Sequence, residues 1–260
     1  MTYCVATNLS EGMIFASDSR TNAGVDNIAK FCKCRILEKA GERVIVTLSS
    51  GNLAISQGTI NLLLQRGRDN HQKNVWNCNS MYEMATLIGD CLRDIQERDG
   101  AYLKQRNIDA TANFIVGGQI KGENPRLFLV YSEGNFIEAS EDTLFFQIGE
   151  TKYGKPILDR VLTPSTTLPV AAKSIIVSFD STMRSNISVG PPIDLIVIEK
   201  NSFKVSVHKR LEEGDPYLSL VHRQWGEGLK KAFAELADMP WESNSGSVHP
   251  LIQTPESGPS

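Results

Sequence analysis

The first 51 residues constrain the fold most, because short apolar segments with β-type composition follow one another there almost without a break. They predict four strands, over residues 2–9, 13–19, 31–37 and 43–49. Glu11 and Gly12 join the first two strands as in a hairpin. The unbroken apolar run Val44-Ile45-Val46 indicates strands that are buried on both faces.

The rest of the chain alternates helical and strand patterns. Apolar residues recur at helical spacing, and Ser80 with Glu83 forms a capping box that begins the second helix. The predicted helices cover residues 53–66, 81–106, 155–162, 168–186 and 216–237. The further predicted strands cover residues 112–120, 126–132, 135–139, 145–149, 193–199 and 203–210. This order predicts an α+β fold, a four-layer αββα sandwich of two antiparallel sheets.

Length and composition bound the domain organisation. The 260 residues with 41% hydrophobic content suit one domain over residues 1–241. Residues 242–260 are rich in Ser, Pro and Gly, so we expect a disordered tail there. A net charge of −3 without a basic block argues against a nucleic-acid partner. No apolar run is long enough to span a membrane and no signal peptide is evident, so we expect a cytoplasmic protein.

Five cysteines form an odd set, which in a cytoplasmic chain predicts reduced thiols. Cys32 and Cys34 flank Lys33, and a C-x-C pair raises the question of a metal. Two ligands do not make a zinc site, so we expect neither a metal nor a cofactor. On a strand, alternate residues share a face. We therefore expect both thiols to point into the core and Lys33 to point into a cleft.

The residue after the initiator methionine can supply a nucleophile together with its own base. A threonine hydroxyl is a weak nucleophile at neutral pH and needs a base within hydrogen-bond reach. Removal of Met1 would leave Thr2 with a free α-amine, whose ordinary pKa of about 7.7–8.0 suits proton transfer. Thr2 would then carry both groups on one residue.

Three further residues complete this candidate chemistry. Lys33 near the threonine oxygen would favour the alkoxide, and Asp18 would hold Lys33 in place. Gly51 follows a strand and precedes a helix, so its amide could bind a developing oxyanion. Taken alone, Asp18 also fits a strand-end turn, Lys33 a solvated lysine and Gly51 a turn glycine. Only the joint pattern indicates an active site.

The block Ser17-Asp18-Ser19-Arg20-Thr21-Asn22-Ala23-Gly24, with Thr2, Lys33 and Ser50-Gly51, resembles proteasome β-type subunits and the bacterial HslV peptidase. The later segments Ser178-Phe179-Asp180-Ser181-Thr182 and Val189-Gly190-Pro191-Pro192 look most like Anbu, the ancestral β subunit. The resemblance covers residues 2 to about 241. It implies that Thr2 is the nucleophile, that Asp18 and Lys33 are its charge partners and that the Gly51 amide is the oxyanion donor. Arg20 matches the arginine that follows the catalytic aspartate.

Two departures from the family pattern affect the groups that hold the threonine amine. The turn that is Ser-Gly-Ser-like in proteasome β subunits reads Ile148-Gly149-Glu150-Thr151 here. Asn186 stands where the family has a helper aspartate. Asp180 and Ser181, earlier on the same helix, could substitute for it.

These observations predict a threonine-type N-terminal-nucleophile peptidase that acts on a peptide or amide substrate. Two alternatives stay open: an amidase of a small or conjugated amide, and a catalytically silent proteasome-like scaffold subunit. The resemblance also implies a homo-oligomer, either a ring or an open helical turn. A Walker-type phosphate loop is absent from the sequence, so any ATP-dependent unfoldase partner would be another chain.

Overall fold

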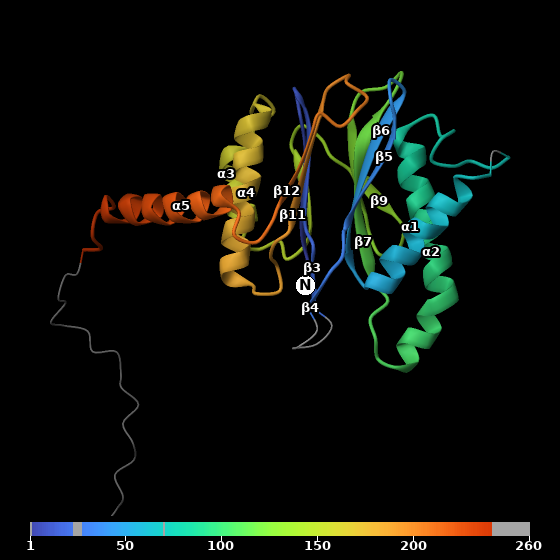
Figure 1. Cartoon of the computed structure of the whole chain (residues 1–260), viewed down its shortest axis with the longest axis horizontal. Helices are drawn as coiled ribbons and strands as arrows, with labels where there is room; N and C mark the ends of the chain where they lie inside the picture. Colours follow the sequence, from blue (N-terminus) through green and yellow to red (C-terminus); the bar gives the residue numbers. More distant parts are fainter. Residues whose placement is uncertain (1, 23–27, 70, 241–260) are drawn as a thin grey trace, which may run out of the picture.

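The structure is a computed structural model that describes residues 2–22, 28–69 and 71–240. It contains two five-stranded antiparallel sheets packed face to face, with helices outside each sheet (Figure 1). The predicted α+β fold, the four-layer αββα sandwich, is confirmed. The tail predicted to be disordered, residues 242–260, lies outside the described residues.

The first sheet carries the N-terminal hairpin at its centre. Its strand order is β10 (Phe145–Gly149), β1 (Tyr3–Leu9), β2 (Gly12–Asp18), β11 (Ile193–Glu199) and β12 (Val207–Leu211). The second sheet has the order β5 (Cys34–Lys39), β6 (Arg43–Gly51), β7 (Ala112–Ile120), β8 (Arg126–Val130) and β9 (Phe136–Glu138). A separate short ribbon pairs β3 (Arg20–Asn22) with β4 (Ile28–Lys30).

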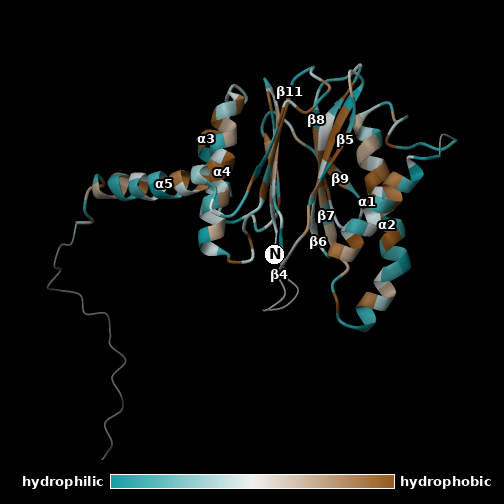
Figure 2. Ribbon diagram, in the orientation of Figure 1, coloured by the Kyte–Doolittle hydropathy of each residue, from teal (hydrophilic) through white to brown (hydrophobic). Residues whose placement is uncertain are grey.

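Helices cover the outer faces of both sheets. α1 (Leu53–Arg66) and α2 (Met81–Gln105) pack on the second sheet, while α3 (Lys155–Val161) and α4 (Leu168–Ser185) pack on the first. Three apolar clusters follow from this layering, one under each helix pair and one between the sheets. In Figure 2 apolar residues are frequent along the strands of both sheets. α5 (Pro216–Ala234) instead extends away from the body.

Side-chain caps begin the two helices on the second sheet. The Oδ1 atom of Asn52 accepts hydrogen bonds from the amides of Ala54 at 3.0 Å and Ile55 at 3.3 Å, which starts α1 directly after β6. The Ser80 hydroxyl accepts from the Glu83 amide at 3.1 Å, as predicted for α2. The Glu83 carboxylate accepts from the Asn79 amide, so the reciprocal half of the box is shifted by one residue.

Two strand predictions need correction. Residues 31–33 are not a strand, and β5 begins at Cys34 because the chain first returns from the β3–β4 ribbon. Cys32 is therefore exposed while Cys34 is buried, so the prediction that both thiols point into the core is wrong for Cys32. The predicted strand 203–210 begins only at Val207, because Asn201 and Phe203 adopt left-handed backbone conformations with φ of 64° and 50°. Among the described residues, no helix has the length and apolar character that crossing a bilayer requires.

Candidate active site

A buried ion pair stands at the end of the N-terminal hairpin. Asp18 is the last residue of β2 and has 0% exposed surface, and Lys33 immediately precedes β5 with 7% exposed. The Lys33 Nζ atom lies 2.8 Å from Asp18 Oδ1 and also donates to the Arg20 carbonyl at 2.7 Å. The Tyr3 amide donates to the same Asp18 oxygen at 3.0 Å. The pair is therefore joined directly to the residue that follows Thr2.

The electrostatics of this pair depend on its burial. Desolvation raises the pKa of the Asp18 carboxyl, and the Lys33 ammonium opposes that rise. A buried carboxylate is stable in the ionised form only when a cation and hydrogen bonds compensate the loss of water. Here Lys33 and the Tyr3 amide supply that compensation to Oδ1, while Oδ2 has no hydrogen-bond partner in the part of the chain that the structure describes.

Thr2, Lys33 and Gly51 line one cavity of about 550 Å³ between the two sheets and the start of α1. The remaining lining residues are mostly small or polar: Ser49, Ser50, Leu53, Ser56, Asp109, Thr111, Asn113 and Gly149. Asp18 stands behind Lys33 and is bonded to it. The structure thus brings the four residues predicted to be catalytic to one place. The cavity can hold a hydroxyl, a cation and a backbone donor around a single substrate carbonyl.

Gly51 ends β6 in a conformation that requires glycine. Its φ is +96°, and a Cβ atom there would stand 2.3 Å from the Thr111 carbonyl oxygen. The next residue, Asn52, caps α1 and donates its own amide to that same Thr111 oxygen at 2.8 Å. Gly51 therefore lies at the N-terminal end of α1, where the helix dipole favours negative charge.

Arg20 ties the ion pair to the loop after α4. Its Nη1 atom donates to the Ile187 carbonyl at 3.1 Å, and its guanidinium lies against Gly190, where a Cβ would come within 2.6 Å of Cζ. Because the Arg20 carbonyl also accepts from Lys33, one residue links the loop to the lysine. Arg20 thus supports the site without lining its cavity.

The two helper residues predicted on α4 lie elsewhere. Asp180 Oδ1 is 2.7 Å from Nδ1 of His222 on α5, and Asp180 lines a separate cavity beside that helix. Ser181 follows it on α4 and is partly buried. Neither residue lines the cavity of Thr2.

Glu150 lies beside Thr2, a placement that the sequence did not reveal, and Asn186 contacts Glu150. The Glu150 amide donates to the Thr2 carbonyl at 2.7 Å, and the Glu150 carboxylate accepts from Asn186 Nδ2 at 3.0 Å. In the sequence Glu150 stands out only as a departure from the family turn. A glutamate in an apolar strand end was the available signal, because charged residues are rarely buried without a role.

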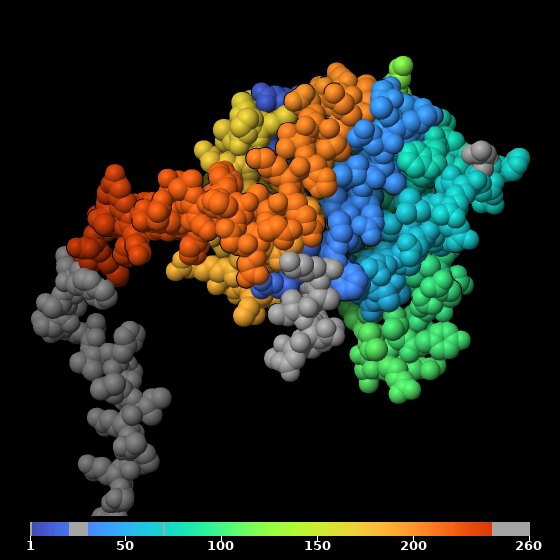
Figure 3. All heavy atoms as spheres, in the orientation of Figure 1, coloured from blue at the N-terminus to red at the C-terminus, as the bar shows by residue number. Residues whose placement is uncertain are grey.

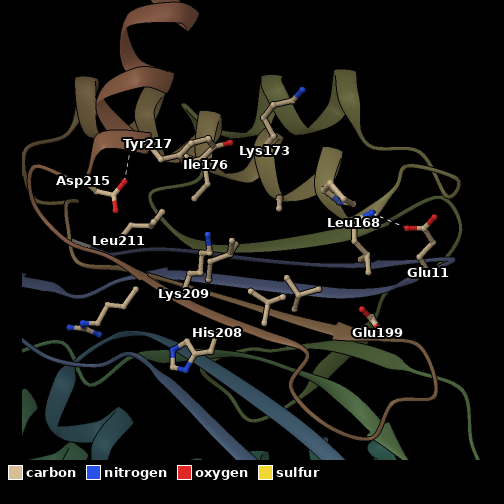
Figure 4. A pocket seen from close by; sticks show the side chains of 16 residues that line it. Glu11, Leu168, Lys173, Ile176, Glu199, His208, Lys209, Leu211, Asp215 and Tyr217 are labelled. Atoms are coloured by element: carbon tan, nitrogen blue, oxygen red, sulfur yellow. Dashed lines mark hydrogen bonds between the residues drawn. The ribbon is translucent and has the colours of Figure 1, made fainter.

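A larger cavity of about 1170 Å³ lies on the other side of the first sheet, under α4 and the start of α5 (Figure 4). Its polar side chains, among them Glu11, Lys173 and Asp215, come from separate elements. Its lining contains neither Ser, Thr nor Cys. The smaller cavity around Thr2 is therefore the better candidate for covalent chemistry. Within the described ranges, no group of three or more His, Cys, Asp or Glu side chains could hold a metal ion.

The two-sheet sandwich, with its helix pairs outside, is the α+β architecture of proteasome-like subunits. Solved structures of similar proteins share this fold over almost the whole chain. Anbu (ancestral beta-subunit) from Yersinia bercovieri is 48% identical, with 93% of this chain and 100% of that chain covered and a TM-score of 0.87. The chain belongs to the Anbu family.

Two further structures support this assignment. The Anbu complex from Pseudomonas aeruginosa, solved as a helical assembly, is 47% identical and covers 94% of this chain and 100% of its own, with a TM-score of 0.88. Anbu from Hyphomicrobium sp. strain MC1 is also 47% identical, covers 92% of this chain and 100% of its own, and has a TM-score of 0.83. No family model matches the sequence, and no curated protein matches it.

Proposed function

We propose that this chain is a threonine peptidase of the N-terminal-nucleophile type. The observation that carries the proposal is the cavity shared by Thr2, Lys33 and Gly51, with Asp18 paired to Lys33 at 2.8 Å. A hydroxyl, a buried cation and a glycine amide at a helix start suit acyl transfer. The proposal requires that Met1 be removed, because the base is the α-amine of Thr2.

The reaction would proceed in two halves. The Thr2 α-amine takes the proton of the Thr2 hydroxyl while Oγ1 attacks the substrate carbonyl carbon. The carbonyl oxygen becomes an oxyanion that the Gly51 amide stabilises. The tetrahedral intermediate collapses to an ester on Thr2, and the leaving amine takes the proton from the α-ammonium. Water then attacks the ester with the α-amine again as base, which frees the acid and restores Thr2.

Lys33 has an electrostatic role in this scheme. Its ammonium is held in place by Asp18, and a fixed cation beside the hydroxyl favours the developing alkoxide. The same cation disfavours protonation of the nearby α-amine, which keeps the base available near neutral pH. Asp18 acts through Lys33 and would not contact the substrate.

We further propose that the chain forms a homo-oligomer, as the helical assembly of the Pseudomonas aeruginosa relative suggests. A peptide or other amide is the proposed substrate, because the cavity is lined by small and polar groups that leave room for an extended chain. A separate ATP-dependent unfoldase is compatible with this arrangement. Sedimentation of the purified chain checks the assembly, and a population of monomers only would contradict it.

Hydrolysis of a panel of fluorogenic peptides tests the activity. We expect Thr2→Ala to abolish cleavage, because it removes the nucleophile. Thr111→Ala is a matched control, since it removes a threonine hydroxyl that lines the same cavity but is bonded to Asp109. Cleavage that Thr2→Ala leaves unchanged would refute the proposal.

A scaffold subunit is the second candidate, and the similarity to a protein that forms a helical assembly favours it. An N-terminal peptide mass that retains Met1 in the protein from its native cells would support the scaffold, because the Thr2 amine would then be acylated. An amidase of a small or conjugated amide uses the same residues. Replacing the peptide panel with such amides separates those two activities.

A further inference from the structure

We propose that the Glu150 carboxylate, oriented by Asn186, binds the α-amine of Thr2 and controls its protonation. This inference rests on the proposed function in one respect, since it needs the Thr2 amine to be free. It assigns a charged partner to the amine at a position where the family pattern has a different turn.

The backbone places Glu150 directly against Thr2. The β1–β10 ladder ends with Tyr3 opposite Gly149. One residue further, the Glu150 amide donates to the Thr2 carbonyl at 2.7 Å. This hydrogen bond holds the backbone of Glu150 beside that of Thr2, which brings the glutamate side chain into the neighbourhood of the Thr2 main-chain nitrogen.

Gly149 makes this close approach possible. Its φ is +86°, and a Cβ atom at this position would stand 2.0 Å from the Thr2 carbonyl oxygen. Any other residue there would push the two strands apart. The glycine thus holds Glu150 at a fixed distance from Thr2.

Glu150 is nearly buried, with 9% of its surface exposed. Its carboxylate accepts a hydrogen bond from the neutral Asn186 Nδ2 at 3.0 Å. Among the described residues, neither a lysine nor an arginine forms an ion pair with it. A buried carboxylate requires a positive partner or further hydrogen bonds to remain ionised. The α-ammonium of Thr2 meets that requirement from the opposite strand.

Asn186 is the positioning residue of this pair. It caps α4, and its amide donates to the Thr182 carbonyl at 2.8 Å, so its side chain leaves a rigid helix end. The loop that follows is held by Arg20 through Ile187. In this proposal the Glu150 carboxylate favours the protonated form of the Thr2 amine, while the Lys33 ammonium disfavours it.

The test measures the Thr2 amine directly in the full chain beginning at Thr2. Trace acetylation with acetic anhydride is followed across the neutral pH range, and the N-terminal peptide is quantified by mass spectrometry. We expect Glu150→Gln to move the midpoint of the labelling curve to lower pH by about one unit, because the opposing carboxylate is lost. Asn186→Ala should move it in the same direction by less.

Glu141→Gln is the matched control, since it removes the same charge from an exposed position and should leave the midpoint unchanged. Equal midpoints for wild type and a folded Glu150→Gln variant would overturn the inference. Should Glu150→Gln not fold, an unmoved midpoint in Asn186→Ala would overturn it instead. The labelling does not depend on catalysis. An active peptidase whose midpoint does not move in Glu150→Gln would contradict only the role of Glu150. An inactive chain that shows the expected shift would contradict only the proposed peptidase activity.

Discussion

At the scale of single residues, the ion pair of Asp18 and Lys33 organises the candidate site. Its partners come from β2, from the segment before β5 and, through the Tyr3 amide, from β1. Burial makes the pair costly to break, because either partner alone would leave an uncompensated group out of water. A buried ion pair is weak evidence for stability, and the proposed chemistry of Thr2 supplies another reason for this arrangement.

A double-mutant cycle on this pair should give a large coupling energy. Lys33→Met should lower the free energy of unfolding by about 3 kcal/mol, because Asp18 loses its cation in a buried position. Asp18→Asn combined with Lys33→Met should cost less than the sum of the two single changes. Urea denaturation measures each variant.

The exposed pair Lys155 and Asp159 is the matched control, since its nitrogen–oxygen distance is also 2.8 Å. Its coupling should be only about 0.3–0.5 kcal/mol, because solvent screens it. Equal coupling in the two cycles would show that burial does not determine the behaviour of Asp18 and Lys33.

Gly51→Ala should be more damaging than an ordinary glycine substitution. The new Cβ would stand 2.3 Å from the Thr111 carbonyl in a backbone of positive φ, so we expect a loss of about 3 kcal/mol and of peptide cleavage. Gly41→Ala is the control, because Gly41 also has positive φ but has open space around it. It should cost about 1 kcal/mol and leave cleavage unchanged. Similar losses in both variants, measured by thermal unfolding, would contradict this reading of Gly51.

At the scale of elements, the sequence predicted most of the fold. Alternating and continuous apolar runs placed the strands of both sheets, and helical spacing placed the five helices within a few residues. The exceptions have local causes. Cys32 was predicted to be buried because strand alternation was extended through residues 31–33, where the chain is still returning from the β3–β4 ribbon.

The site was partly predictable for the same reason. Thr2, Asp18, Lys33 and Gly51 lie at strand ends, and the order of the strands brings those ends together. The place of Glu150 beside Thr2 was not predictable, because it follows from the register between β1 and β10, which are far apart in sequence. Asp180 was a plausible helper in sequence, but the helix turns it toward His222.

The cap of α1 gives a prediction at this scale. Asn52→Ala removes both hydrogen bonds to the first turn and should lower the free energy of unfolding by about 1 kcal/mol. Because Asn52 follows Gly51, the change should also reduce kcat for peptides more than it changes KM. Ser80→Ala removes the cap of α2 away from the cavity and should affect stability alone. An unaltered kcat in Asn52→Ala would show that the start of α1 does not influence oxyanion binding at Gly51.

At the scale of the whole molecule, α5 is the helix whose surface is left largely uncovered in the monomer. Its second half stands clear of the sheets and of the other helices in the space-filling view (Figure 3). Leu229 and Phe233 share one side of α5 and are 51% and 77% exposed, and Leu236, just beyond the helix, is 68% exposed. An apolar surface of this kind indicates contact with another molecule, and in the proposed homo-oligomer that molecule would be a second copy of the chain.

Disrupting this apolar surface should weaken assembly. Leu229→Ser with Phe233→Ser should shift sedimentation toward smaller species, because apolar contacts between copies are lost. Gln224→Ser changes an exposed polar residue on the same helix and is the control. Both variants should keep the thermal unfolding of the isolated chain, since these side chains are exposed in the monomer. An unchanged assembly in the double variant would assign the apolar surface another role.

Covalent trapping of Thr2 tests its proposed role as the nucleophile. A peptidyl α′,β′-epoxyketone can add to both the hydroxyl and the α-amine of an N-terminal threonine, and intact mass with peptide mapping then locates the adduct. We predict one adduct per chain on Thr2, absent in Thr2→Ala and formed much more slowly in Lys33→Met. Peptide cleavage by a chain whose Thr2 stays unmodified, or an adduct confined to the exposed thiol of Cys32, would contradict the account.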